Sequence, residues 1–201
     1  MSSKRTIVLD AMGVIYRARD DVEELLVPFI RSHGSSIDTG ELNILYEKAS
    51  LGQLDVDEFW RELDLSPAIE DEYLAGHELN EGALDFLNFA RNIGIDVWCL
   101  SNDVSRWSFK LRKRFLLEDL FVDFVISADI GFRKPSEQAY HCLIDRIGHL
   151  PDLFVDDRVR NVSAAQLAGI PSVCFGASSG EYNRVWDFDS LQNRVQSIGT
   201  F

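Results

Sequence analysis

The chain has 201 residues, of which 46% are hydrophobic and 26% charged, and its formal net charge is −13 at pH 7. This length accommodates one substantial hydrophobic core with a smaller inserted unit. The negative charge argues against a nucleic-acid partner, because few basic residues are available to neutralise phosphates, and no apolar run is long enough to predict a membrane span.

The cysteine pattern indicates a reducing compartment. Cys99, Cys142 and Cys174 are an odd number and show no CxxC spacing, which argues against a disulfide framework and against a zinc site. The segment MSSKRTIVLD holds no apolar stretch of signal-peptide length. We therefore expect a cytoplasmic protein, and the sequence gives no indication of its oligomeric state.

The first predicted strand ends at a carboxylate. Residues 6–9 (TIVL) form a short apolar run that is typical of a buried strand, and Asp10 follows directly. A carboxylate at the end of a buried strand costs free energy unless it has a partner. Asp10 is therefore a candidate functional residue.

Residues 17–79 carry helical patterns and no strand pattern. Capping boxes of the form Asp-x-x-Glu precede apolar residues at helical spacing. These boxes begin at Asp20, Asp38 and Asp55. We predict an all-helical unit over 17–79, with Phe59 and Trp60 in its core rather than in a substrate pocket.

From residue 80 onward, predicted strands alternate with helices. The expected strands are 95–101, 123–127, 152–157 and 171–175. Short, nearly continuous apolar strands alternating with helices indicate a parallel sheet that is covered on both faces. We predict an α/β fold with a Rossmann-like parallel sheet, built from residues 1–16 and 80–201. The basic run at 110–114 (KLRKR) is expected to be a solvated helix face.

Polar residues stand at or shortly after the ends of these strands. They are Asp10, Ser101, Asn102, Lys134, Asp156 and Asp157. The carboxyl ends of parallel strands meet at one edge of a sheet, which is where such folds bind ligands. A divalent cation between Asp10 and Asp157, with Lys134 alongside, would relieve the repulsion among the carboxylates. Oxygen ligands of this kind suit Mg²⁺.

Four stretches resemble, in order, the motifs of the haloacid-dehalogenase-like (HAD) hydrolase superfamily. They are DAMGV, LSN, RKPS and FVDDRVRN. The helical unit over 17–79, including LGQLDVDEFW, resembles the helical cap that this superfamily carries after its first motif. The resemblance covers essentially the whole chain and implies a hydrolase, most often a phosphatase of a small phosphorylated metabolite.

The resemblance implies roles in catalysis. Asp10 would attack phosphorus and form an aspartyl-phosphate, Ser101 would hydrogen-bond the transferring phosphoryl group, and Lys134 would bridge the nucleophile and the phosphoryl oxygens. The residues placed against the substrate are Ala11, Met12, Asn102 and Lys134.

The resemblance also implies a Mg²⁺ site. Asp10, Asp157 and the backbone carbonyl of Met12 would bind the metal ion. Asp156 would support the water shell of the metal, and Asn161 is a candidate for the same outer role.

Met12 departs from the family pattern. Many family phosphatases carry a second aspartate at this position, which protonates the leaving group, and methionine cannot transfer a proton. General acid–base help is worth about 10²–10⁴-fold in rate. The predicted metal site survives the change, because it uses the backbone carbonyl.

Several hypotheses about the function remain open. In a phosphatase, the proton would come from water, from the substrate or from a cap residue such as Lys48. In a 2-haloacid dehalogenase, Asp10 would attack carbon without a metal, although the pair Asp156 and Asp157 does not fit that chemistry. The fold could also serve binding alone, or Lys48 could form a Schiff base in a phosphonate hydrolase.

Overall fold

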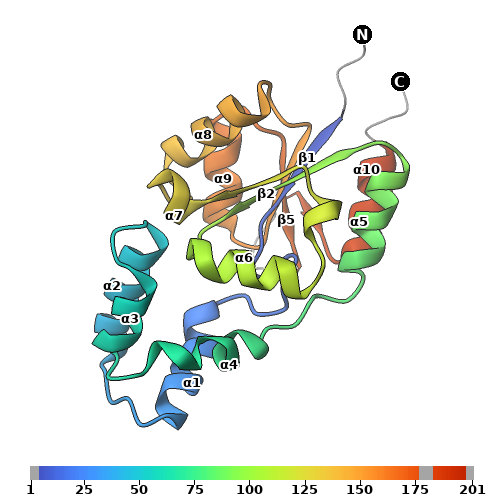
Figure 1. Ribbon diagram of the computed structural model, residues 1–201. Helices are drawn as coiled ribbons and strands as arrows, with labels where there is room; N and C mark the ends of the chain where they lie inside the picture. The colour runs from blue at the N-terminus through green and yellow to red at the C-terminus, as the bar shows by residue number, and fades with distance from the viewer. Residues whose placement is uncertain (1–4, 177–182, 198–201) are drawn as a thin grey trace.

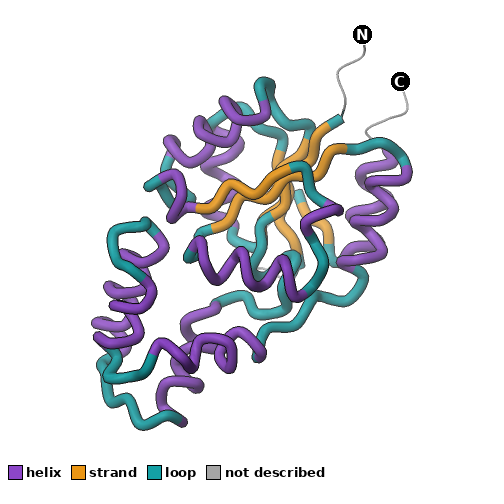
Figure 2. The backbone as a smooth tube through the Cα atoms, viewed as in Figure 1, coloured by secondary structure: helices purple, strands orange, loops and turns teal. Residues whose placement is uncertain are grey.

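The computed structural model describes residues 5–176 and 183–197. These residues form a central six-stranded sheet with helices on both sides and a separate group of helices beyond one edge (Figures 1 and 2). The strands are β1 (Thr6–Leu9), β2 (Asp96–Ser101), β3 (Asp123–Ile126), β4 (Leu153–Asp156), β5 (Ser172–Phe175) and β6 (Arg184–Val185). The predicted Rossmann-like α/β fold is confirmed.

All neighbouring strands of the sheet run parallel, in the order β3-β2-β1-β4-β5-β6. The chain moves from β1 to β2 and β3 on one side, and then crosses to β4, β5 and β6 on the other. β1 therefore lies at the point where the strand order reverses, which is where open α/β sheets bind ligands. The two-residue strand β6 was not predicted, because so short a segment has no readable periodicity.

Helices cover both faces of the sheet. The helices are η1 (Val22–Leu26), α1 (Val27–Ser32), α2 (Thr39–Ser50), α3 (Val56–Glu62), η2 (Pro67–Ile69), α4 (Glu70–Ala75), α5 (Ala83–Asn92), α6 (Ser105–Arg114), η3 (Glu118–Leu120), α7 (Ser127–Ile130), α8 (Glu137–Ile147), α9 (Val159–Leu167) and α10 (Phe188–Ser197). Alternate residues of β1 enter two different apolar clusters. Ile7 and Leu9 belong to the cluster that contains Phe86 of α5, whereas Val8 joins Tyr140 of α8. This alternation explains why the strands are apolar throughout.

The segment between β1 and α5 is helical, as predicted, and aspartates cap two of its helices, α2 and α3. Asp38 accepts a hydrogen bond from the backbone of residue 40, and Asp55 caps α3 in the same way. The first predicted capping box is wrong in one member. Asp20 accepts from the Glu23 amide, but the reciprocal carboxylate is that of Glu24, which accepts from the Asp20 amide at 2.9 Å.

The chain enters and leaves this helical unit side by side. Tyr16 and Leu79 form an antiparallel bridge, and the amide of Asn80 donates to the carbonyl of Ile15 at 2.9 Å. Figure 1 shows the helices of the unit, α1 to α4, beyond the carboxyl edge of the sheet and next to α6. A two-point connection of this kind fixes where the unit sits relative to that edge.

An aromatic cluster joins the helical unit to the sheet domain. Trp107 of α6 packs against Phe59, Trp60 and Tyr73, with ring centroids 5.0–5.6 Å apart. Phe59 and Trp60 are fully buried in this cluster, in agreement with the prediction that they form core rather than pocket.

Glu70 of α4 ties the same two regions together. Its buried carboxylate accepts hydrogen bonds from the indole nitrogens of Trp60 and Trp107, at 3.2 and 2.9 Å. It also binds Arg106 and Lys110 of α6, each at 2.7 Å. Burial alone would raise the pKa of Glu70, but the hydrogen bonds from Arg106 and Lys110 outweigh it and hold that pKa below its usual value.

The basic run at 110–114 is not simply a solvated face. Lys110 binds Glu70 and Asp71, and the Arg114 guanidinium donates to the carbonyl of Leu74 at 2.6 Å. These contacts hold α4 against α6, which a helical pattern alone could not indicate. Among the residues described, no helix has the length and apolar character that a bilayer crossing requires.

We predict that Glu70→Gln lowers the free energy of unfolding by about 1.5–3 kcal/mol at pH 7, because charge-assisted hydrogen bonds are lost. The lowered pKa of Glu70 means that its contribution is present above the ordinary glutamate pKa and is lost as the pH falls. In urea unfolding, the difference from wild type should therefore stay constant from pH 7 to about pH 5 and shrink below the ordinary glutamate pKa. Glu62→Gln, at an exposed position, is the control, and equal stability of the Glu70 variant and wild type at pH 7 would contradict the prediction.

Candidate active site

The candidate active site lies where β1, β2 and β4 end side by side. Asp10 follows β1, Ser101 ends β2, and Asp156 and Asp157 stand at the end of β4. Lys134 reaches the same place from the loop between α7 and α8. All five residues are buried, with at most 6% of their surface exposed. The structure therefore brings together the residues that the sequence placed at this edge.

Lys134 is the central cation of the site. Its Nζ lies 2.7 Å from Oδ1 of Asp10 and 2.7 Å from Oδ2 of Asp156. Burial would lower the pKa of Lys134, but the charges of Asp10 and Asp156 outweigh it and raise that pKa. The side chain is therefore a fixed ammonium that bridges two carboxylates.

Asp156 is fully engaged by protein groups. Its Oδ1 accepts from the amide of Arg158 at 2.8 Å, and both of its oxygens lie 3.0 Å from Nδ2 of Asn161. With Lys134 on Oδ2, neither oxygen lacks a partner. Asp156 and Asn161 thus form a rigid support under the lysine.

Asp157 differs from Asp156 because it keeps one oxygen available. Oδ2 accepts a hydrogen bond from Nε of Arg19 at 2.9 Å, whereas the buried Oδ1 has no hydrogen-bond partner. Burial raises the pKa of Asp157, and Arg19 opposes that rise. A buried carboxylate oxygen without a donor is costly unless a cation binds it.

The three carboxylates form a cluster that fits a metal ion. One oxygen from each of Asp10, Asp156 and Asp157 lies within 4.8 Å of the other two. Burial raises the pKa of Asp10 well above its usual range, the charges of Asp156 and Asp157 add to this rise, and Lys134 opposes it. Such a group of hard oxygen ligands, with one buried oxygen unpaired, suits Mg²⁺.

Gly13 allows the first loop to approach the carboxylate of Asp157. Its φ is +77°, and a Cβ at this position would lie 2.5 Å from Cγ of Asp157. Any larger residue would displace the Asp157 side chain and would also strain the backbone. The glycine in DAMGV is thus required by the close packing of β1 and β4 loops.

Ser101 and Asn102 differ in how their side chains are used. The buried Oγ of Ser101 has no hydrogen-bond partner, which leaves it available to a ligand. Asn102 binds the backbone of Lys134 at both ends, with Nδ2 donating to the carbonyl at 2.8 Å and Oδ1 accepting from the amide at 2.7 Å. Asn102 therefore positions the lysine loop, and its predicted contact with substrate stays a prediction.

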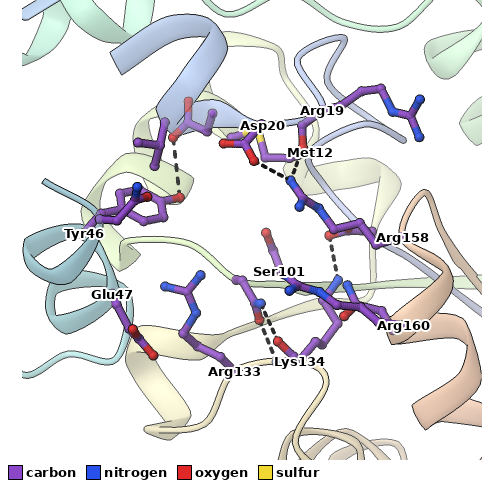
Figure 3. A pocket seen from close by; sticks show the side chains of 16 residues that line it. Met12, Arg19, Asp20, Tyr46, Glu47, Ser101, Arg133, Lys134, Arg158 and Arg160 are labelled. Carbon is purple, nitrogen blue, oxygen red and sulfur yellow. Dashed lines mark hydrogen bonds and ion pairs between the residues drawn. The ribbon is translucent and has the colours of Figure 1, made fainter. Parts of the chain in front are cut away.

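Ala11 and Met12 lie on the first loop. The amide of Ala11 donates to Oδ1 of Asp10 at 2.7 Å. Because Lys134 binds the same oxygen, Oδ2 is the Asp10 oxygen available for chemistry. Met12 is 9% exposed, belongs to the apolar core and also lines the pocket (Figure 3).

A pocket of about 230 Å³ opens above these residues. The sheet domain supplies one wall and the helical unit the other, with Tyr46 and Glu47 of α2 on the far side (Figure 3). The pocket holds four arginines that sequence reasoning missed. They are Arg19, Arg133, Arg158 and Arg160. Three of them, Arg133, Arg158 and Arg160, belong to the motifs RKPS and FVDDRVRN, and this was the signal available in the sequence.

Lys48 does not take part in this pocket. It is exposed on α2 and is absent from the residues that line the cavity. The structure therefore gives no support to Lys48 as a proton donor or as a Schiff-base lysine.

The fold and site define an α/β protein with buried carboxylates and a buried lysine at the carboxyl edge of a parallel sheet. A family model described as haloacid dehalogenase-like hydrolase matches residues 4–169. The chain belongs to the haloacid dehalogenase-like hydrolase family, as its four motifs had indicated.

One relative is a protein named as a HAD-hydrolase, YfnB, from Bacillus subtilis (strain 168). It is 27% identical to this chain over 99 residues, which are 47% of this chain and 42% of that protein. The matched segment therefore spans less than half of the relative. A magnesium-bound crystal structure of YfnB superimposes with a TM-score of 0.71 at 17% identity, covering 96% of this chain and 99% of that one.

Two further structures show the range of chemistry on this fold. A HAD family enzyme from Bacteroides thetaiotaomicron, in complex with magnesium and inorganic phosphate, has a TM-score of 0.74 at 18% identity and covers 89% of this chain and 98% of its own. The L-2-haloacid dehalogenase of Xanthobacter autotrophicus, with chloropropionic acid covalently bound, has a TM-score of 0.68 at 15% identity, with coverages of 96% and 98%. At these identities the likeness shows a shared fold.

We predict that Gly13→Ala destabilises the protein more than Gly34→Ala does. Both glycines have positive φ, but a Cβ at Gly34 would meet no atom within 4 Å. Gly34→Ala should cost about 1–2 kcal/mol from backbone strain, and Gly13→Ala a further 1–3 kcal/mol or so from the clash with Asp157. Urea unfolding of both variants measures the difference, and equal losses would contradict the account.

Proposed function

We propose that the protein is a cytoplasmic, Mg²⁺-dependent phosphatase of a small phosphorylated metabolite, acting through an aspartyl-phosphate on Asp10. The observation that carries the proposal is the bridge of Lys134 between Asp10 and Asp156, beside an Asp157 oxygen that has no hydrogen-bond partner. This arrangement suits a reaction in which a negatively charged phosphoryl group is transferred to Asp10, because Lys134 lies beside Asp10 and can neutralise part of the charge.

Mg²⁺ would be held by Asp10, Asp157 and the backbone carbonyl of Met12, while Asp156 and Asn161 support the site from outside. When bound, the metal ion would neutralise charge on the phosphoryl oxygens and on the carboxylates. The magnesium and inorganic phosphate in the related Bacteroides enzyme support this assignment.

The chain's own residues account for the remaining requirements of phosphoryl transfer. Oδ2 of Asp10 would attack phosphorus as the bond from phosphorus to the leaving oxygen breaks, and water would then hydrolyse the aspartyl-phosphate. The ammonium of Lys134 would bind phosphoryl oxygens that carry developing charge. Ser101, whose buried hydroxyl has no protein partner, would donate a hydrogen bond to the same group.

Met12 limits the proton transfers that this site can perform. Figure 3 shows Asp20 of the helical unit beside Met12, but Asp20 is bound to Arg158 at 2.9 Å. Burial would raise the pKa of Asp20, yet the hydrogen bond from Arg158 outweighs it and lowers that pKa. A carboxyl with a lowered pKa is a poor acid for a leaving group, so the proton would come from water or from the substrate.

We also propose that residues 17–79 act as the cap of the enzyme. They supply Arg19, Asp20, Tyr46 and Glu47 to the pocket, opposite the groups that would perform the chemistry. Cap residues would therefore meet the leaving group of the substrate and select it.

Dehalogenation is the second candidate, supported by the Xanthobacter structure with covalently bound chloropropionic acid. In that reaction Asp10 would attack carbon and no metal would be needed. The unpaired oxygen of Asp157 and the cluster that it forms with Asp10 and Asp156 would then have no purpose. A purely binding role is the remaining alternative.

The first test is phosphate release from a panel of phosphorylated metabolites, with 2-haloacids assayed in parallel. We expect release to stop when Mg²⁺ is chelated and to return when it is restored. Asp10→Asn should lower turnover by a factor on the order of 10³ or more, since the nucleophile is lost. Asp145→Asn, an exposed change on α8, is the matched control.

Two outcomes would overturn the proposal. Metal-independent halide release would establish dehalogenation, and absence of turnover on every substrate would favour a binding role.

A second test concerns Met12. If the only effect of Met12 is that the site lacks a general acid, Met12→Asp should raise turnover of alkyl phosphates by roughly tenfold or more. It should raise turnover of p-nitrophenyl phosphate less, because p-nitrophenolate leaves without being protonated. Steady-state kinetics on both substrates measure the effect, and an equal or negative effect on both would count against this reading.

A further inference from the structure

The pocket concentrates positive charge in an otherwise acidic protein. The chain carries 20 Lys and Arg against 33 Asp and Glu, yet four arginines line this single cavity. Two of them are balanced by carboxylates. Arg19 binds Asp157 at 2.9 Å, and Arg158 binds Asp20 at the same distance.

The other two arginines have no carboxylate partner among the described residues. Arg133 donates to Oγ of Ser50 and stacks over the ring of Tyr46 at 5.6 Å. For Arg160, no ion pair or hydrogen bond is found within 5–176 and 183–197. The guanidinium groups of Arg133 and Arg160 thus line the cavity without forming an ion pair among the described residues. The exposed Glu47 lies at the edge of the same cavity.

The two groups approach the reaction site from different elements. Arg133 lies in the loop before α8, and Arg160 lies in the first turn of α9. Figure 3 shows both side chains extending into the space around Ser101, one from each side. The contacts of Arg133 with Tyr46 and Ser50 of α2 also fix its position relative to the cap.

We infer that the substrate carries a second anionic group on its leaving-group side, and that Arg133 and Arg160 bind it. This inference rests on the proposed phosphatase function. The transferring phosphoryl group already has Lys134, Ser101 and the proposed metal site. A planar guanidinium matches a carboxylate or a phosphate with two parallel hydrogen bonds, so either anion fits the pair.

The size of the cavity limits this substrate. At about 230 Å³ it is smaller than the roughly 300–1,000 Å³ of pockets for drug-sized ligands. The class indicated is therefore a small phosphorylated acid or a small bisphosphate, rather than a nucleotide.

Matched probes test the inference. 3-Phosphonooxypropionate is compared with its carboxamide, and ethylene glycol bisphosphate with 2-hydroxyethyl phosphate. We expect the wild-type enzyme to favour each probe with two anionic groups over its match with one by about tenfold or more in kcat/KM, from charge-assisted hydrogen bonds. The pair with the larger preference identifies the anion as carboxylate or phosphate.

Arginine variants locate the effect. Arg160→Gln should reduce that preference by about tenfold, mainly through KM, and leave p-nitrophenyl phosphate within twofold of wild type. Arg133→Gln should act similarly, but it also loses contacts with the cap, so Arg160→Gln is the decisive variant. Arg61→Gln, which removes one exposed positive charge outside the pocket, should change nothing.

Three results would overturn the inference. They are no preference of the wild type for the probes with two anionic groups, an equal loss on p-nitrophenyl phosphate, and a preference that Arg160→Gln does not alter. An equal loss would mean that Arg160 acts on the transferring phosphoryl group.

Binding separates this inference from the phosphatase proposal. Calorimetric titration of the Asp10→Asn protein with the same probe pairs needs no turnover. Selective binding that depends on Arg160 supports the inference even when phosphate release fails, and unselective binding refutes it even when phosphate release succeeds.

Discussion

The burial of three carboxylates around one lysine is the constraint on which this structure depends. Asp10, Asp156 and Asp157 lie close together at the edge of a parallel sheet, where water cannot screen their repulsion. Lys134 compensates two of them and Arg19 the third. One oxygen of Asp157 remains without a donor, so the protein alone leaves the cluster incomplete. This oxygen is the one to which the proposed Mg²⁺ is assigned.

A second buried carboxylate is paired with cations where the helical unit meets the sheet domain. Glu70 accepts hydrogen bonds from the indole nitrogens of Trp60 and Trp107 and forms ion pairs with two cations of α6. Trp107 also packs among the aromatic side chains of the unit. Arg133 adds a contact that reaches α2 beside the pocket. The unit is thus held to the sheet domain through both α4 and α2, and residues of the unit line the cavity together with the proposed nucleophile.

The arginines of the pocket bear on how much the site needs a proton donor at position 12. Methionine cannot transfer a proton, but the pocket that Met12 lines contains four arginines. Fixed positive charge near a leaving oxygen stabilises negative charge there, so a site of this kind depends less on protonation of the leaving group. A substrate with a second anion would supply binding energy for the same purpose, since groups remote from the reaction can contribute to positioning.

The sequence by itself determined the parallel α/β fold, the helical unit after the first strand and the line of polar residues from Asp10 to Asp157. These follow from local periodicity and from the rule that parallel strands end at one edge, and both are readable in the chain. The capping partner Glu24, the contacts of Lys110 and Arg114 with α4, and the short strand β6 were decided only by tertiary structure. The hydrogen-bond partners of the acidic pair were decided in the same way, with both oxygens of Asp156 bound and one oxygen of Asp157 left without a donor. The family resemblance had assigned Asp157 to the metal and Asp156 to a supporting role, but it could not give their hydrogen-bond partners, because Lys134, Asn161 and Arg19 meet them only when the sheet is assembled.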